Sequence, residues 1–174
     1  MKIAYLQRFS LIDYPGRICA TLFTRGCNFR CPYCHNPELL PGQRTPDDPS
    51  SGDVLDFLKT RQGKLDAITI TGGEPTLQGE ALLSFAQAVK DLGLLVKVDT
   101  NGSRPDILEH LVMEKLADYI AMDIKGPLES YGRVAGIDVN PETIRHSIRV
   151  VMESAPDYEF RTTVVKSLLS PEDL

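Results

Sequence analysis

The sequence predicts an α/β fold built on a parallel β-sheet. Short apolar, β-branched runs recur from one end of the chain to the other, and a helical pattern of apolar residues separates most of them. Strands that alternate with helices in this way are joined by crossovers and pair in parallel. At 174 residues, the chain is long enough for one hydrophobic core, so we expect a single domain over residues 1–174.

Five runs have the character of strands that are buried in a parallel sheet. They span residues 17–24, 67–71, 94–100, 119–125 and 159–165. A further short strand is expected near the N-terminus, because Asp13-Tyr14-Pro15-Gly16 has the residues of a type II turn. This turn should connect the N-terminal strand to the first of the five.

Four helices are predicted from apolar residues at helical spacing, over residues 54–58, 82–89, 107–116 and 141–151. The fourth has a clear start, since Asn140 is a good N-cap and Pro141 suits the first helical position. Residues 41–52 are rich in Pro and Gly, which predicts a long loop.

The last five residues, Ser170-Pro171-Glu172-Asp173-Leu174, also form a helix-start signal. No helical pattern follows them. We therefore expect the chain to be the N-terminal part of a longer protein.

Charge and hydropathy exclude several classes of function. The net charge is −5 and no two basic residues are adjacent, so we expect no nucleic acid or anionic membrane as a partner. The longest apolar stretches are far too short to span a bilayer. Arg8 comes too early for a signal-peptide core, which predicts a cytoplasmic protein.

Three of the four cysteines, Cys27, Cys31 and Cys34, form a C-x-x-x-C-x-x-C run. This spacing suits metal ligands or redox thiols better than a disulfide framework. Structural zinc needs four ligands, whereas an iron–sulfur cubane held by three thiolates keeps one iron open for a ligand. The candidate fourth ligands are His35, which directly follows Cys34, and Cys19, whose apolar surroundings indicate a core residue.

Polar or flexible residues follow four of the predicted parallel strands. Ligands of parallel α/β proteins bind beyond the carboxyl ends of the strands, so these segments should line one pocket. A glycine pair there permits close approach of a ligand to the backbone, and a following glutamate can meet an amine. Two aspartates on neighbouring strands predict a shared cation, and a nearby lysine suits a ligand carboxylate or one of the aspartates. The segments are Gly26 with the cysteine loop, Gly72-Gly73-Glu74-Pro75, Asp99-Thr100-Asn101-Gly102 and Asp123-Ile124-Lys125-Gly126.

The cysteine run, with Tyr33 before its third cysteine, and the later Gly72-Gly73-Glu74 resemble the motifs of the radical S-adenosylmethionine (radical SAM) enzymes. Four further motifs resemble the branch that activates glycyl-radical enzymes, such as anaerobic ribonucleoside-triphosphate reductase and pyruvate formate-lyase. These motifs are Asp13-x-Pro15-Gly16, Cys34-His35-Asn36, Asp99-Thr100-Asn101-Gly102 and Met122-Asp123-x-Lys125. The resemblance covers residues 7–165.

The resemblance implies a role for each matching residue. Cys27, Cys31 and Cys34 would bind a [4Fe–4S] cluster whose open iron takes SAM. The residues matched to SAM contacts are Tyr33 and His35 near the adenine, Gly72, Gly73 and Glu74 at the methionine amine, and Asn101, Lys125 and Arg161 elsewhere in the pocket. A monovalent cation, Na⁺ or K⁺, would be held by Asp99, Asp123 and the carbonyl groups of Thr100 and Ala121.

The resemblance also implies a fold and a reaction. The family fold is a partial (β/α) barrel of about six units, of which this chain would lack the last. The reaction would be reductive cleavage of SAM and removal of a glycine α-hydrogen from a partner enzyme, here expected to be the anaerobic ribonucleotide reductase. A flavodoxin or ferredoxin would supply the electron. Two alternatives stay open, namely a radical SAM enzyme acting on a small molecule and a non-catalytic iron–sulfur or zinc module.

Overall fold

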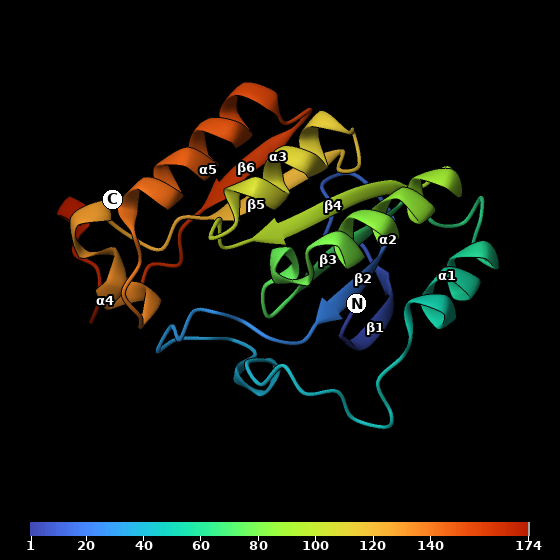
Figure 1. Cartoon of the computed structure of the whole chain (residues 1–174), viewed down its shortest axis with the longest axis horizontal. Coiled ribbons are helices and arrows are strands. Elements are labelled where there is room, and N and C mark those ends of the chain that lie inside the picture. Colours follow the sequence, from blue (N-terminus) through green and yellow to red (C-terminus); the bar gives the residue numbers. More distant parts are fainter. Residues whose placement is uncertain (174) are drawn as a thin grey trace.

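One sheet organises the molecule, which is described by a computed structural model for residues 1–173. Within these residues the sheet has six strands in the order β1-β2-β3-β4-β5-β6 (Figure 1). Strand β1 is antiparallel to β2, and the other neighbours are parallel. The strands are β1 Ile3–Ser10, β2 Cys19–Thr24, β3 Ala67–Gly72, β4 Leu95–Thr100, β5 Tyr119–Asp123 and β6 Tyr158–Arg161.

Helices cover one face of this sheet. Figure 1 shows α2 and α3 over the central strands, and α2 also contacts α1 while α3 also contacts α5. The helices are α1 Ser51–Lys59, α2 Glu80–Asp91, α3 Pro105–Met113, α4 Tyr131–Ala135 and α5 Pro141–Ser154. Within residues 1–173, none of the helices combines the length and the apolar character that crossing a bilayer requires.

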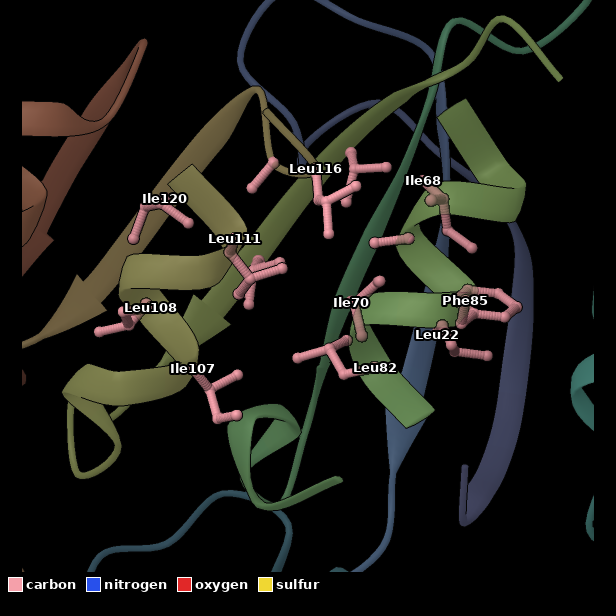
Figure 2. Close-up of a cluster of buried hydrophobic side chains, with 14 of the residues drawn as sticks. Leu22, Ile68, Ile70, Leu82, Phe85, Ile107, Leu108, Leu111, Leu116 and Ile120 are labelled. Atoms are coloured by element: carbon pink, nitrogen blue, oxygen red, sulfur yellow. The ribbon is translucent and has the colours of Figure 1, made fainter. Parts of the chain in front are cut away.

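The main core lies between the helices and this face of the sheet. Figure 2 shows Ile70 of β3 close to Leu82 of α2, with Ile68 farther along the strand, and all three side chains are fully buried. Side chains alternate across a strand, so Thr69, between the two isoleucines, points to the opposite face. The period of two therefore gives the sheet one apolar face under the helices and one face on which polar side chains are common.

The opposite face is closed at the amino ends of the parallel strands. Tyr14, from the β1–β2 connection, is buried there with Cys19, Ala67, Tyr119 and Ala121. The turn predicted at this connection is present, since the Arg17 amide donates to the Tyr14 carbonyl at 3.2 Å. Its glycine, Gly16, has a φ of +68°, which a type II turn needs. The expectation that Cys19 is a core residue is confirmed.

The α/β class, the N-terminal strand and all five parallel strands are confirmed, but three strand bounds are wrong by two residues or more. Strand β2 begins at Cys19 rather than at 17. Strand β5 ends at Asp123 rather than at 125, and β6 ends at Arg161 rather than at 165. The last backbone bond between them runs from the Ile124 amide to the Arg161 carbonyl at 2.8 Å. Beyond that point β6 has no partner, because Gly126 and Pro127 follow in the chain after β5.

The predicted loop 41–52 is two residues too long, because α1 already begins at Ser51. The Ser50 side chain accepts a hydrogen bond from the Asp53 amide, and the Asp53 carboxylate accepts one from the Ser50 amide. This capping box starts the helix. The S-x-x-D spacing of Ser50 and Asp53 is a sequence signal for this helix start.

The same loop is fixed to the end of β2 by a buried ion pair. Asp48 is almost fully buried and receives hydrogen bonds of 2.6 Å from both Nε and a terminal nitrogen of Arg25. The Thr45 amide and hydroxyl donate to the same carboxylate. Arg25 and these Thr45 groups hold the pKa of Asp48 well below its usual range. Because Arg25 lies two residues before Cys27, the pair also fixes one end of the cysteine loop.

Replacing Asp48 with asparagine should lower the free energy of unfolding by about 3 kcal/mol at pH 7, since Arg25, whose side chain is only 16% exposed, loses its counter-charge. Because the pKa of Asp48 is lower in the folded protein, its carboxylate stabilises the fold at pH values above the pKa of an unfolded aspartate, about 4. This stabilisation is lost as the pH falls below that value. The difference from wild type should therefore shrink below about pH 4. Urea unfolding of both proteins from pH 3 to pH 7 measures this difference in the free energy of unfolding.

The matched control is Asp106→Asn, because Asp106 pairs with Arg104 on the surface at 2.6 Å. It should cost less than about 1 kcal/mol. Equal losses in the two variants would contradict the role given to Asp48.

Two features at the C-terminal end of the chain differ from expectation. Helix α4 was not predicted, because five residues are too few for a periodic pattern. Pro171–Asp173 forms a short 3₁₀ turn, in which the Asp173 carboxylate accepts a hydrogen bond from the Ser170 amide at 2.8 Å. The helix-start signal at 170–174 thus gives one turn over the described residues, and Leu174 lies outside them.

Candidate active site

A cavity of about 420 Å³ lies at the carboxyl ends of the parallel strands. Its wall is made by the cysteine loop and by residues at the ends of β3, β4, β5 and β6. All but one of the site residues predicted from sequence line this cavity. Those that line it are Cys27, Cys31, Tyr33, Cys34, His35, Gly72, Gly73, Glu74, Asp99, Thr100, Asn101, Asp123, Lys125 and Arg161. The exception is Ala121, which is fully buried within β5. The prediction of a single pocket is therefore confirmed.

The three loop cysteines are free thiols, each partly exposed to the cavity. Burial raises the pKa of Cys27 to about 11 and also raises the pKa of Cys31. Both are therefore protonated at neutral pH, and iron binding would release protons. Within residues 1–173, no three His, Cys, Asp or Glu side chains converge on one point as a single metal ion requires. A cubane cluster uses a different iron for each thiolate, so three thiols spread around one cavity fit it.

The cysteine loop is held by bonds to distant parts of the chain. The Arg30 amide donates to the Ala135 carbonyl at 2.8 Å, which ties the loop to α4. Gly136, at the end of α4, packs so closely on the Arg30 carbonyl that a Cβ atom there would collide with it. At the other end of the loop, the Gly26 amide donates to Leu39 at 2.8 Å. The thiols are thus presented from a fixed loop.

Cys27 receives two hydrogen bonds at its sulfur. The donors are the Phe29 amide, 3.4 Å from Sγ, and Nδ2 of Asn101, 3.8 Å from Sγ. The Asn101 side chain also donates to Oδ1 of Asn28 at 3.1 Å. Asn101 therefore joins the end of β4 to the cysteine loop, a contact that the sequence did not predict.

The glycine pair permits a close approach, and in this structure the approaching group is the chain itself. A Cβ atom on Gly72 would collide with the backbone of Thr24, and one on Gly73 with the carbonyl of Gly26. The Gly73 amide donates to Thr24 at 2.9 Å, and the Glu74 amide donates to Gly26 at 2.8 Å. The glycines therefore let β3 seat the first residues of the cysteine loop.

Glu74 is 1% exposed, and its carboxylate accepts four hydrogen bonds. Oε1 accepts from the amide and hydroxyl of Thr76 and from the hydroxyl of Thr100, and Oε2 accepts from the Asn101 amide at 2.6 Å. Burial raises the pKa of Glu74, against the opposite effect of these bonds. The carboxylate thus holds β3 and β4 together, and Oε2, which accepts one bond where Oε1 accepts three, has acceptor capacity left.

Charged side chains cluster on the wall formed by β4, β5 and β6. Nε of Arg161 is 2.9 Å from Oδ1 of Asp123, and a terminal nitrogen of Arg161 is 3.3 Å from Oδ2 of Asp99. Lys125 lies 3.0 Å from Asp123. Burial lowers the pKa of Lys125, but Asp123, Cys31 and Tyr33 together raise it by more, so the side chain stays an ammonium ion. The sequence predicted these four residues as pocket groups.

The Tyr33 hydroxyl at the cavity wall fits a site for a polar ligand. Its hydroxyl is buried, and it has no hydrogen-bond partner among residues 1–173. Buried hydroxyl groups are normally paired, so an unpaired one beside a cavity fits a site for a polar ligand. Phe29, Asn36, Leu40, Thr71 and Thr163 also line the cavity and were not predicted.

Comparison with known proteins agrees with this geometry. The model of the "Radical SAM superfamily" matches residues 21–167, which is most of the chain. The chain belongs to the radical SAM superfamily. The cofactors of this family are a [4Fe–4S] cluster and SAM, and the cavity offers thiols for the first and polar groups for the second.

Curated relatives of this radical SAM chain are named as activating enzymes. A protein of Methanocaldococcus jannaschii, named as a glycyl-radical enzyme activating enzyme, is 37% identical over 170 residues, which cover 95% of this chain and 69% of the relative. The pyruvate formate-lyase-activating enzyme of Clostridium pasteurianum is 30% identical over 131 residues, which cover 71% of this chain and 52% of the relative. The chain thus spans between half and about two thirds of these relatives.

Solved radical SAM structures share the fold. TYW1 with a lysine–pyruvate adduct superposes with a TM-score of 0.64 at 17% identity, covering 86% of this chain and 56% of that one. Native anSMEcpe with bound AdoMet gives a TM-score of 0.59 at 18% identity, covering 78% of this chain and 40% of that one. The open, mostly parallel sheet of residues 1–173 is therefore a partial barrel of the radical SAM type, as predicted.

Proposed function

We propose that this chain cleaves SAM reductively at a [4Fe–4S] cluster and installs a glycyl radical on a partner enzyme. One observation supports this most strongly: three free thiols, a glycine pair and a set of charged side chains share one cavity. The relatives named as activating enzymes support the choice of reaction. When bound, the cluster and SAM supply a 5′-deoxyadenosyl radical that takes the glycine α-hydrogen.

In this proposal the protein binds the cluster, orients SAM and excludes water from the cavity. Cys27, Cys31 and Cys34 hold the cluster, and Gly72 and Gly73 keep the cysteine loop against β3. Tyr33, with its unpaired hydroxyl, contacts the nucleoside side of SAM together with His35. No side-chain base is required, because hydrogen-atom transfer needs positioning rather than proton removal.

The methionine side of SAM would lie toward β3–β6. The oxygen Oε2 of Glu74 has acceptor capacity left for the amine, and Lys125 offers an ammonium ion for the carboxylate. Asn101, which lines the cavity and donates to Sγ of Cys27, connects the cluster ligands to the end of β4. Phe29 and Leu40 add apolar surface that keeps water away from a reactive radical.

For the partner enzyme we propose the anaerobic ribonucleoside-triphosphate reductase, with a flavodoxin or ferredoxin as the electron donor. Pyruvate formate-lyase is the competing partner, because several relatives are named for it. The two partners carry different sequences around the radical glycine. Peptides from those loops can therefore distinguish them.

The test uses the anoxically reconstituted chain, dithionite, SAM and a glycyl-loop peptide with a deuterated glycine α-carbon. Deuterium should appear in 5′-deoxyadenosine with the reductase peptide and not with a peptide that has alanine in place of glycine. Transfer from the pyruvate formate-lyase peptide alone would contradict the partner. SAM cleavage without transfer from either peptide would indicate a small-molecule substrate, and a colourless, zinc-containing protein would contradict the cluster.

A further inference from the structure

Lys97 is a buried ammonium group that the sequence analysis did not assign to the site. Its side chain is 3% exposed, and Nζ lies 2.7 Å from Oδ1 of Asp99. Glu159 is 3.9 Å away, and the Tyr119 ring centre is 5.7 Å away. A buried charge is costly unless it is paired. The Asp99 carboxylate therefore neutralises the buried lysine, and the lysine in turn neutralises Asp99.

Strand register explains how the charges meet. Lys97 and Asp99 are two residues apart on β4, so both point to the polar face of the sheet. Asp99 is opposite Ala121 on β5, and Asp123 is opposite Arg161 on β6. The small Ala121 side chain leaves space for the Arg161 guanidinium to reach past it to Asp99.

Every carboxylate oxygen of the two aspartates faces a nitrogen of a protein cation. Oδ1 of Asp99 meets Lys97 at 2.7 Å, and Oδ2 of Asp99 meets Arg161 at 3.3 Å. Oδ1 of Asp123 meets Arg161 at 2.9 Å, and Oδ2 meets Lys125 at 3.0 Å. With Glu159 included, three acidic groups face three basic groups, so the cluster is balanced without an added ion.

This arrangement does not fit the expectation that a monovalent metal ion neutralises the pair. Na⁺ or K⁺ at Asp99 and Asp123 would share oxygens that an ammonium or guanidinium group already contacts, and these positive groups would repel it. The Lys97 side chain cannot turn out to solvent, because it is enclosed between β4, Tyr119 and Glu159.

We propose that Lys97 and Arg161 are the resident cations of the Asp99–Asp123 pair, so that SAM binding by this chain does not depend on a monovalent metal ion. The inference rests on SAM binding in the cavity, as under the proposed function, and not on the identity of the partner enzyme. In this arrangement Lys97 is a positioning residue that acts through Asp99, since it is buried behind that carboxylate.

The test measures binding of SAM to the anoxically reconstituted protein by calorimetry, in sodium, potassium and choline chloride at equal ionic strength. Wild type should give the same dissociation constant in all three salts. Lys97→Met keeps most of the side-chain volume and removes the charge, so SAM binding should weaken about tenfold in choline and recover in sodium or potassium. Lys97→Arg keeps the charge and should remain independent of the salt.

The control is Lys90→Met, because Lys90 pairs with Asp118 outside the cavity and its loss should leave the salt response unchanged. The ²³Na resonance gives a second readout that does not need SAM. Lys97→Met should broaden this resonance, and wild type should not. Added potassium should displace sodium from Lys97→Met and sharpen the resonance again. The proposal would be overturned if wild type bound SAM more tightly in sodium than in choline, or if wild type broadened the sodium resonance. It would also be overturned if Lys97→Met bound SAM equally well in all three salts, as wild type should. Absence of SAM binding in every salt would instead contradict the proposed function, and the sodium resonance would then decide this inference alone.

Discussion

Replacing Cys31 with alanine should leave the protein without its iron–sulfur cluster. Cys31 is the middle thiol of the three around the cavity, and the other two can hold only two irons. After anoxic reconstitution, Cys31→Ala should lack the brown colour and the iron and sulfide of the wild type. SAM cleavage should disappear with the cluster, while the far-ultraviolet circular dichroism should stay unchanged because Cys31 is only partly buried.

Cys19→Ala is the matched control, since Cys19 is fully buried on β2 with Tyr14 and Ala67. Its thiol accepts a hydrogen bond from the Thr69 hydroxyl at 3.7 Å and does not line the cavity. This variant should keep the cluster and SAM cleavage and lose stability only through the small space left in the core. Loss of the cluster in Cys19→Ala would overturn the ligand assignment.

Replacing Gly73 with alanine should disrupt both the fold around the cavity and cluster binding. The added methyl group would enter the space of the Gly26 carbonyl, which is backbone and cannot rotate away. The Glu74-to-Gly26 hydrogen bond of 2.8 Å would then break, and Cys27 would move with Gly26. Overpacking of this kind costs about 1–3 kcal/mol, so urea unfolding should shift and reconstitution should yield less cluster.

Gly52→Ala serves as the control for Gly73→Ala. Gly52 lies in the first turn of α1, and a Cβ atom there would meet only the Ser50 hydroxyl, at an ordinary 3.5 Å. Alanine favours the helix over glycine, so stability should stay equal or rise by up to about 1 kcal/mol. If Gly73→Ala also behaves in this way, the cysteine loop does not need the close contact described above.

The sequence was sufficient to predict most of the residues that surround the cavity, because parallel strands place their carboxyl ends at one edge of the sheet and so bring their strand ends together. Asp99 and Asp123 are 24 positions apart in the printed sequence, yet they meet the same Arg161 side chain. Strand ends were less predictable, as β6 shows, because a strand ends where its neighbour leaves.

What the sequence did not predict were the partners of individual side chains. Lys97 lies between Val96 and Val98 of β4, and its position in the sequence does not show that its ammonium group is buried beside Asp99 rather than exposed to solvent. The same holds for Asp48, whose partner Arg25 is far away in the chain, and for the contact between Arg30 and Ala135. Glu74 was predicted at the cavity, but its four hydrogen bonds depend on the register of β3 with β4.

The fixing of the cysteine loop by α4 has a consequence for biosynthesis. Ala135 follows the three crossovers that lead from β2 to β5, so its bond with Arg30 needs contacts between distant parts of the chain to form first. Until then three neighbouring thiols are open to oxidants, and premature disulfides would trap the nascent polypeptide. Delivery of iron and sulfide should therefore succeed best after folding is complete, with oxygen absent throughout.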